Sequence, residues 1–102
     1  NQRKVFDLVI EKDGAKKYIE VERGTHATDD FFKAMDKIAQ ITKEFYFVAP
    51  TDKIIYQVTK AKVFKWISDR LGGFQNAKGY KFCFTTLEKI KKSDNPWEEV
   101  NL

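Results

Sequence analysis

The dipeptide Asp13-Gly14 constrains this chain more than any other feature of its sequence. Asp-Gly is typical of the two-residue turn that closes a β-hairpin, because both residues tolerate positive φ. Segments with strand character lie on either side of it. Residues 4–11 are rich in branched and aromatic side chains, and residues 16–23 place Tyr, Ile and Val among charged residues. The sequence therefore predicts an N-terminal antiparallel hairpin.

A two-residue turn also fixes which residues of the hairpin face each other. Lys12 then faces Ala15, and counting back along both strands puts Asp7 directly opposite Glu20. We expect one face of the hairpin to be its core face, formed by Phe6, Leu8, Ile10, Ile19 and Val21. The other face carries Val5, Val9, Tyr18 and Glu22 beside the two facing acids.

Two carboxylates that face each other on adjacent strands repel, since their Cβ atoms lie about 4.5–5.5 Å apart. A divalent cation would offset this repulsion, and Mg²⁺ is often held by only one or two carboxylates together with water and substrate phosphates. Two alternatives remain open. The acids are also compatible with an exposed strand face screened by water, and a three-residue loop with a bulge would shift the register and separate them.

The rest of the chain alternates helix and strand signals. The predicted helices cover residues 31–42, 52–71 and 87–92, and the predicted strands cover residues 44–49 and 80–85. Thr28, Thr51 and Thr86 are candidate helix caps. A helix between successive strands favours a parallel crossover. We therefore expect an α/β fold whose mixed sheet, an antiparallel N-terminal hairpin plus parallel strands, is flanked by helices in the order β-β-α-β-α-β-α.

With 102 residues, of which 42% are hydrophobic and 33% charged, the chain predicts a single packed domain. Cys83 is the one cysteine, which excludes an internal disulfide and a cysteine-rich zinc site. No apolar run approaches the length of a membrane span, so we expect no membrane insertion and a cytoplasmic protein. Because the sequence starts at Asn1 rather than Met, we expect residues 1–102 to be one domain of a larger protein.

The net charge of +4 lies entirely in the second half of the chain. Residues 1–51 carry nine basic and nine acidic groups, whereas residues 52–102 carry ten basic and six acidic ones. This asymmetry favours a polyanionic partner. The cations that we expect to contact DNA phosphates are Lys60, Lys62, Lys65, Arg70, Lys78 and Lys81. A solvated helix face is the alternative, and we expect Phe64 and Trp66 to belong to the core.

Residues 4–86 resemble the core of the PD-(D/E)xK nuclease superfamily. The resemblance rests on Phe6-Asp7-Leu-Val-Ile-Glu11, on Tyr18-Ile-Glu20-Val-Glu22-Arg23-Gly24 and on the strand Phe45-Tyr-Phe-Val48. It implies a restriction endonuclease-like core in which Asp7 and Glu20 bind the metal, with the carbonyl of Val21 as a third ligand. The chain departs from the motif at position 22, which is Glu in an E-x-E variant rather than Lys, and no proline precedes Asp7. Activity is therefore left open.

The same resemblance implies DNA phosphodiester hydrolysis assisted by Mg²⁺ or Mn²⁺. Glu22 would position water or a second ion, and Lys37 or Lys33 would supply the missing cation. The string Ile19-Glu-Val-Glu-Arg-Gly-Thr25 is also similar to nuclease-like domains of bacterial replication-relaxation and conjugative-transfer proteins of mobile elements. This implies DNA and further domains of a larger protein as partners. A catalytically inactive DNA- or protein-binding module on the same fold is the alternative.

Overall fold

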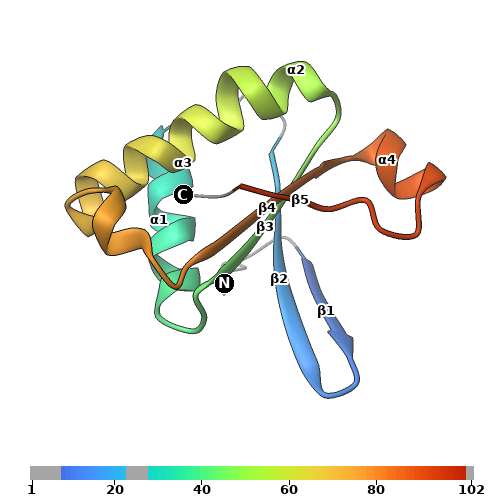
Figure 1. The fold of residues 1–102 in the computed structure, drawn as a ribbon, viewed down its shortest axis with the longest axis horizontal. Helices are drawn as coiled ribbons and strands as arrows, with labels where there is room; N and C mark the ends of the chain where they lie inside the picture. The colour runs from blue at the N-terminus through green and yellow to red at the C-terminus, as the bar shows by residue number, and fades with distance from the viewer. Residues whose placement is uncertain (1–7, 23–27, 101–102) are drawn as a thin grey trace, which may run out of the picture.

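A computed structural model describes residues 8–22 and 28–100 of the chain (Figure 1), and the structural statements below refer to these ranges. The strands are β1 (Leu8–Lys12), β2 (Ala15–Val21), β3 (Glu44–Ala49), β4 (Lys81–Thr86) and β5 (Glu98–Glu99). The helical elements are α1 (Thr28–Ala39), α2 (Asp52–Ile54), η1 (Ile55–Thr59), α3 (Lys60–Trp66), η2 (Ile67–Leu71), η3 (Phe74–Ala77) and α4 (Leu87–Lys92). No helix within these ranges is long and apolar enough to cross a membrane.

The five strands form one mixed sheet whose spatial order is also the chain order, β1-β2-β3-β4-β5. The outer pairs β1–β2 and β4–β5 are antiparallel, and the inner pairs β2–β3 and β3–β4 are parallel. The helix α1 connects the first parallel pair, and residues 52–71 begin the connection of the second. The prediction of an α/β fold with a mixed sheet is confirmed. With two residues, β5 is too short to produce a strand pattern in the sequence.

The hairpin has the predicted two-residue turn. Asp13 and Gly14 have φ angles of 53° and 79°, as a type I′ turn requires. Lys12 pairs with Ala15, and the register continues without a bulge to Leu8, which faces Ile19. Asp7 lies outside the described residues, with Val5 and Phe6, so its position opposite Glu20 stays a prediction.

Residues 52–71 form one continuous helix, as predicted, from α2 through η2. Thr51 caps its start, because the Thr51 Oγ1 accepts a hydrogen bond from the backbone N–H of Ile54 at 3.3 Å. The turns η1 and η2 are π-helical: the N–H of Lys60 donates to the carbonyl of Ile55, five residues earlier. The side chains that this helix buries are Ile55, Thr59, Val63, Trp66 and Ile67.

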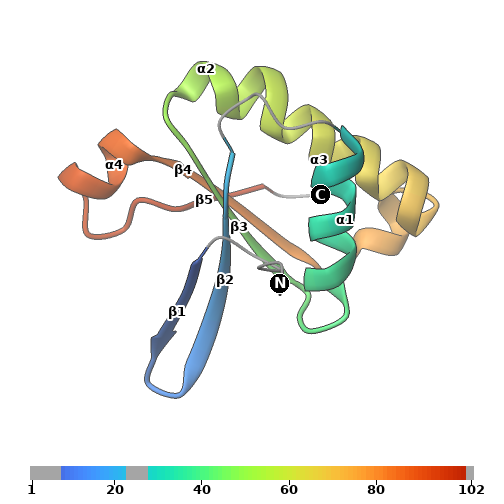
Figure 2. The same cartoon turned by 180° about the vertical axis from the view of Figure 1, so that it is seen from behind.

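The main core fills the space between the central strands and the helices α1 and α3, which lie side by side on one face of the sheet (Figures 1 and 2). Its aromatic side chains stack across neighbouring strands: the ring centroid of Phe45 lies 5.1 Å from that of Phe82 and 5.6 Å from that of Trp66. The other face of the sheet holds a smaller cluster formed by Ile19, Tyr46, Val48 and Cys83, against which Trp97 packs.

The sequence-based assignment of the hairpin faces is wrong. Tyr18 packs against the main core, and Glu20 lies beside Phe47 in the parallel register, so the face with the acids is the one that the helices cover. Of the residues expected on the core face, Ile19 is buried in the smaller cluster and Ile10 is exposed. The physical reason is that both faces of β2 carry apolar side chains, and alternation separates two faces without showing which one receives the helices.

Candidate functional site

Two buried carboxylates lie at the end of β2, on the sheet face that the helices cover. Glu20 is 9% exposed and Glu22 is 1% exposed. They are two residues apart on an extended chain, so their Cα atoms lie about 6.6 Å apart and their side chains share a face. The backbone N–H of Glu22 donates to the carbonyl of Val48 at 2.7 Å, which continues the ladder between β2 and β3 and fixes the direction of the Glu22 side chain. The residue between the two acids is Val21.

Lys62 of α3 reaches one acid of this pair, Glu22. Its Nζ lies 3.4 Å from Oε2 of Glu22 and 5.5 Å from the ring centroid of Phe31 in α1. Burying a carboxylate is costly unless a cation accompanies it, and Lys62 places a cation beside Glu22. Lys62 is one of the cations predicted to contact DNA. In the structure its ammonium group lies against an acid forty positions earlier in the chain.

The other predicted site residues are placed differently. Lys33 and Lys37 are exposed on α1, and Lys37 lies in its last turn. Phe31, which contacts Lys62, is six residues before Lys37 and therefore about 9 Å away along the helix axis. The lysine that the structure brings to Glu22 is thus Lys62. Within the described ranges, no group of three or more His, Cys, Asp or Glu residues could hold a metal ion, and Asp7 lies outside those ranges.

Four of the remaining predicted DNA-contacting cations form ion pairs within the domain. These pairs are Lys60–Glu98 at 3.2 Å, Lys65–Asp69 at 3.5 Å, Arg70–Asp36 at 3.3 Å and Lys81–Glu99 at 3.9 Å. Lys78 is exposed after η3. On the long helix, Lys60 reaches Glu98 in β5 while Lys62 reaches Glu22 after β2, so these two cations point to different sides of the helix. The contact of all six cations with DNA stays a prediction.

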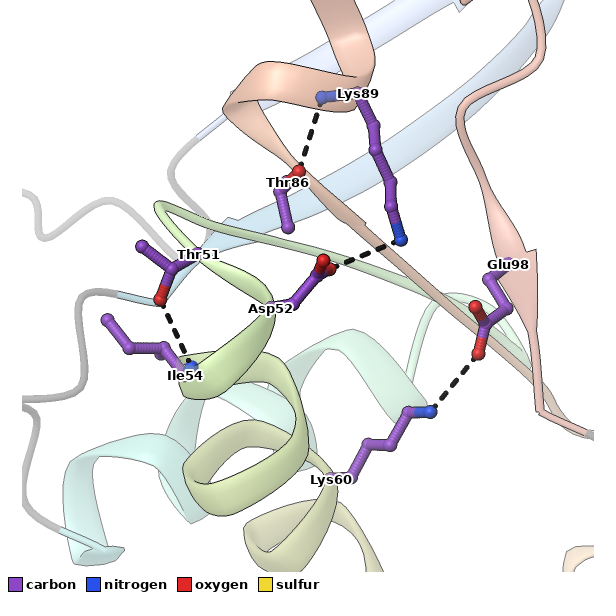
Figure 3. Close-up of polar contacts among 7 residues, drawn as sticks. All are labelled: Thr51, Asp52, Ile54, Lys60, Thr86, Lys89 and Glu98. Carbon is purple, nitrogen blue, oxygen red and sulfur yellow. Dashed lines mark hydrogen bonds and ion pairs between the residues drawn. The ribbon is translucent and has the colours of Figure 1, made fainter.

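A second polar cluster lies where the parallel strands β3 and β4 end (Figure 3). Thr86 caps α4, since its Oγ1 accepts a hydrogen bond from the backbone N–H of Lys89 at 3.2 Å. The ammonium group of Lys89 lies 3.2 Å from Asp52, and the hydrogen bond to this carboxylate raises the pKa of Lys89. The carboxyl ends of parallel strands are where α/β sheets usually bind ligands. In this chain, Asp52 and Lys89 neutralise each other there.

Two titratable side chains of the smaller cluster are held in their neutral forms. Burial raises the pKa of the Cys83 thiol. Burial, followed by the hydrogen bond that its hydroxyl donates to Glu44 at 2.7 Å, raises the pKa of Tyr46. Cys83 is buried in β4. Trp97 packs edge-on against Tyr46, with ring centroids 5.0 Å apart.

The prediction that Phe64 and Trp66 both belong to the core is half wrong. Trp66 is buried, and its Nε1–H donates to Asp36 at 2.8 Å. Phe64 is exposed, as is Tyr56 eight residues before it. The sequence shows the spacing of Tyr56 and Phe64 along the helix, but it does not show which side of the helix packs against the sheet.

Comparisons with protein-family models, with curated proteins and with solved structures find no match for this chain. The interpretation of the site therefore depends on its own geometry and on the sequence motif.

Proposed function

We propose that this chain is a nuclease-like domain that acts on DNA, with Mg²⁺- or Mn²⁺-assisted phosphodiester hydrolysis as its reaction. The observation that carries the proposal is the group formed by Glu20, Glu22 and Lys62: two buried carboxylates lie at the end of one strand, and the largely covered Lys62 side chain pairs with Glu22. The two acids are those of the E-x-E element. Lys62 provides the cation that the motif lacks at position 22. We further propose a bacterial cytoplasmic setting, within a replication, mobilisation or conjugative-transfer protein.

The donor chemistry of the acids fits the proposed ion. Carboxylate oxygens are the ligands that Mg²⁺ prefers, and one or two of them suffice when water and substrate phosphates complete the shell. Glu20 and Asp7 would hold the ion, which would supply Lewis-acid assistance and lower the pKa of a bound water. Lys62 fixes the Glu22 carboxylate beside Glu20 and keeps a positive charge at the site, where negative charge develops during phosphoryl transfer.

A cleavage assay on linear, nicked and branched DNA with added Mg²⁺ or Mn²⁺ tests this proposal. We expect metal-dependent cleavage that Asp7→Ala and Glu20→Ala each reduce at least ~100-fold, since metal ligands would be lost. Glu11→Ala is the matched control, because Glu11 is an exposed acid on the same hairpin. Cleavage that survives both Asp7→Ala and Glu20→Ala would remove the proposed site.

The second candidate function is a catalytically inactive DNA- or protein-binding module on the same fold. The observation that favours it is the pairing of Glu22 with Lys62, which partly neutralises the acidic pair without a metal. Titration with Mg²⁺ while the backbone amide signals of Glu20 and Glu22 are followed separates the two. Absence of local shifts at millimolar metal, together with absence of cleavage, selects the binding module. A steep salt dependence of binding then identifies DNA rather than protein as its partner.

A further inference from the structure

Three aromatic side chains are exposed on one side of the long helix and of the turn that follows it. Tyr56 is 55% exposed, Phe64 is 37% exposed and Phe74 is 48% exposed. Tyr56 and Phe64 are eight residues apart on the continuous helix 52–71, about 12 Å along its axis. A regular α-helix would turn about 80° between them, and the wider π-helical turn η1 reduces this angle, so the two rings project to the same side. Phe74 meets Phe64 edge-on, with ring centroids 5.7 Å apart. We call these three residues the aromatic row.

Positive charge accompanies the aromatic row. Lys60 lies between Tyr56 and Phe64 in the helix, and its Nζ is 4.2 Å from the ring centroid of Tyr56 while it also pairs with Glu98 at 3.2 Å. Residues 52–78, which contain the row, carry six basic and two acidic groups, and Lys62, Lys65 and Arg70 among them pair with acids of the domain. Exposed lysines stand near both ends of the row, Lys53 before Tyr56 and Lys78 after Phe74.

The end of the row is held in place by a compact loop. Gly72 ends the helix with a φ of 81°, and the N–H of Gly73 donates to the carbonyl of Ile67. The side-chain amide of Asn76 donates to the carbonyl of Leu71 at 2.6 Å. These bonds fix η3, and with it Phe74, against the end of the helix. Aromatic rings that are already positioned lose less conformational entropy on binding.

We propose that the aromatic row binds single-stranded nucleic acid by stacking unpaired bases on Tyr56, Phe64 and Phe74. Exposed rings interleaved with cations are the combination that sequence-tolerant single-strand binding requires, because every base offers a π-face and every nucleotide a phosphate. In a duplex the base faces are already stacked, so the row would favour single strands. An apolar protein partner would leave the exposed lysines near the ends of the row, Lys53 and Lys78, without a counter-charge.

This surface is separate from the acidic pair. Lys62, which contacts Glu22, is two residues after Lys60 and therefore about 200° round the helix from it. Binding at the row does not rest on hydrolysis at Glu20, and the two are measured independently. If the chain binds single-stranded nucleic acid without cleaving it, this proposal stands and the proposed nuclease activity does not.

Fluorescence anisotropy with labelled short oligothymidylate, oligouridylate and a duplex of equal length tests the proposal at low salt. The two homopolymers distinguish DNA from RNA as the source of the strand. We expect single strands to bind more tightly than the duplex. Tyr56→Ala, Phe64→Ala and Phe74→Ala should each weaken binding by about fivefold to 150-fold, the loss of one stacked base. Phe64→Tyr should keep the affinity and Phe64→Leu should lose it, because only the former retains a ring.

The matched control is Ile41→Ala, which removes an equally exposed apolar side chain elsewhere. Circular dichroism and thermal melting of each variant establish that it is folded. The proposal is overturned if the unmodified chain binds no oligonucleotide at low salt, if the duplex binds as tightly, or if Phe64→Leu matches Phe64→Tyr. A sedimentation change in the row variants with unaltered oligonucleotide binding would also overturn it, because the row would then be a contact between copies of the chain.

Discussion

Replacing Lys62 by methionine should destabilise the domain far more than replacing any surface lysine, because it leaves a buried carboxylate without its cation. Glu22 is 1% exposed, and the Lys62 side chain is itself largely covered. Methionine keeps the aliphatic length of the lysine and removes only the charge. The change therefore isolates the electrostatic contribution of Lys62 from its packing against Phe31.

The expected magnitude follows from the geometry. At 3.4 Å and an effective dielectric constant near 20, the attraction between Glu22 and Lys62 is about 5 kcal/mol. Removing one partner of a buried pair typically costs about 3–5 kcal/mol. We expect Lys62→Met to lower the free energy of unfolding by an amount in that range, and the melting temperature by at least ~12 °C for a domain of this size. Lys62→Arg, which keeps the charge, should lose less than half as much.

Urea unfolding followed by Trp fluorescence measures these differences. Lys65→Met is the control, because Lys65 pairs with Asp69 on the exposed side of the same helix and should change stability by less than about 1 kcal/mol. In the double variant Glu22→Gln with Lys62→Met, both charges of this ion pair are removed together, so part of the lost stability should return. A loss for Lys62→Met no larger than that for Lys65→Met would refute a buried ion pair at this position.

Three further changes probe other parts of the fold. Asp36→Ala should lower the free energy of unfolding by about 2 kcal/mol, because the buried indole N–H of Trp66 loses its acceptor. Asp36→Asn keeps an acceptor and should lower this free energy less. Equal losses for the two variants in chemical denaturation would contradict this reasoning. Raised pKa values in the folded state mean that the folded chain keeps the Cys83 and Tyr46 protons after the unfolded chain has released them. Stability should therefore be complete below about pH 8.5 and fall as the pH rises further. Urea unfolding midpoints between pH 7.5 and pH 10 measure this loss of stability. If the double variant Tyr46→Phe with Cys83→Ala shows an equal loss over the same pH range, other groups cause it. Thr51→Ala should lower the free energy of unfolding by about 1 kcal/mol, because it removes the N-cap of the long helix, whereas Thr51→Ser should lower it little. Thermal melting of the two variants measures the difference, and equal melting temperatures would contradict the capping role.

Local chemistry predicted the hairpin and the helix starts. Asp13-Gly14 fixed the turn and with it the register, because only a two-residue turn of this type suits positive φ at both positions. Thr51 and Thr86 were predicted as caps and are caps, since a capping hydroxyl acts within three residues of its own position. The strand 44–49 was predicted from its unbroken apolar run, and both of its faces are indeed covered.

Features that depend on tertiary packing were not accessible from the sequence. The pairing of Glu22 with Lys62 joins positions forty residues apart. Glu and Lys are usually exposed to solvent, so neither residue alone indicated a buried pair. The hairpin faces were assigned the wrong way round because the face with Tyr18, Glu20 and Glu22 has the polar pattern of a solvent-facing side, although the helices cover it. The exposure of Phe64 depends on the rotation of the helix about its axis, which the π-helical turns alter without a matching pattern in the sequence.

The agreement between strand order in the sheet and order along the chain bears on how the domain is made. Each strand pairs with the strand synthesised just before it, so no strand must wait for a distant partner or insert between two others. Contacts that are close in sequence form quickly, because little loop entropy is lost in closing them. On the ribosome, the sheet can therefore grow by adding one strand at a time at a single edge, with β5 as the last addition.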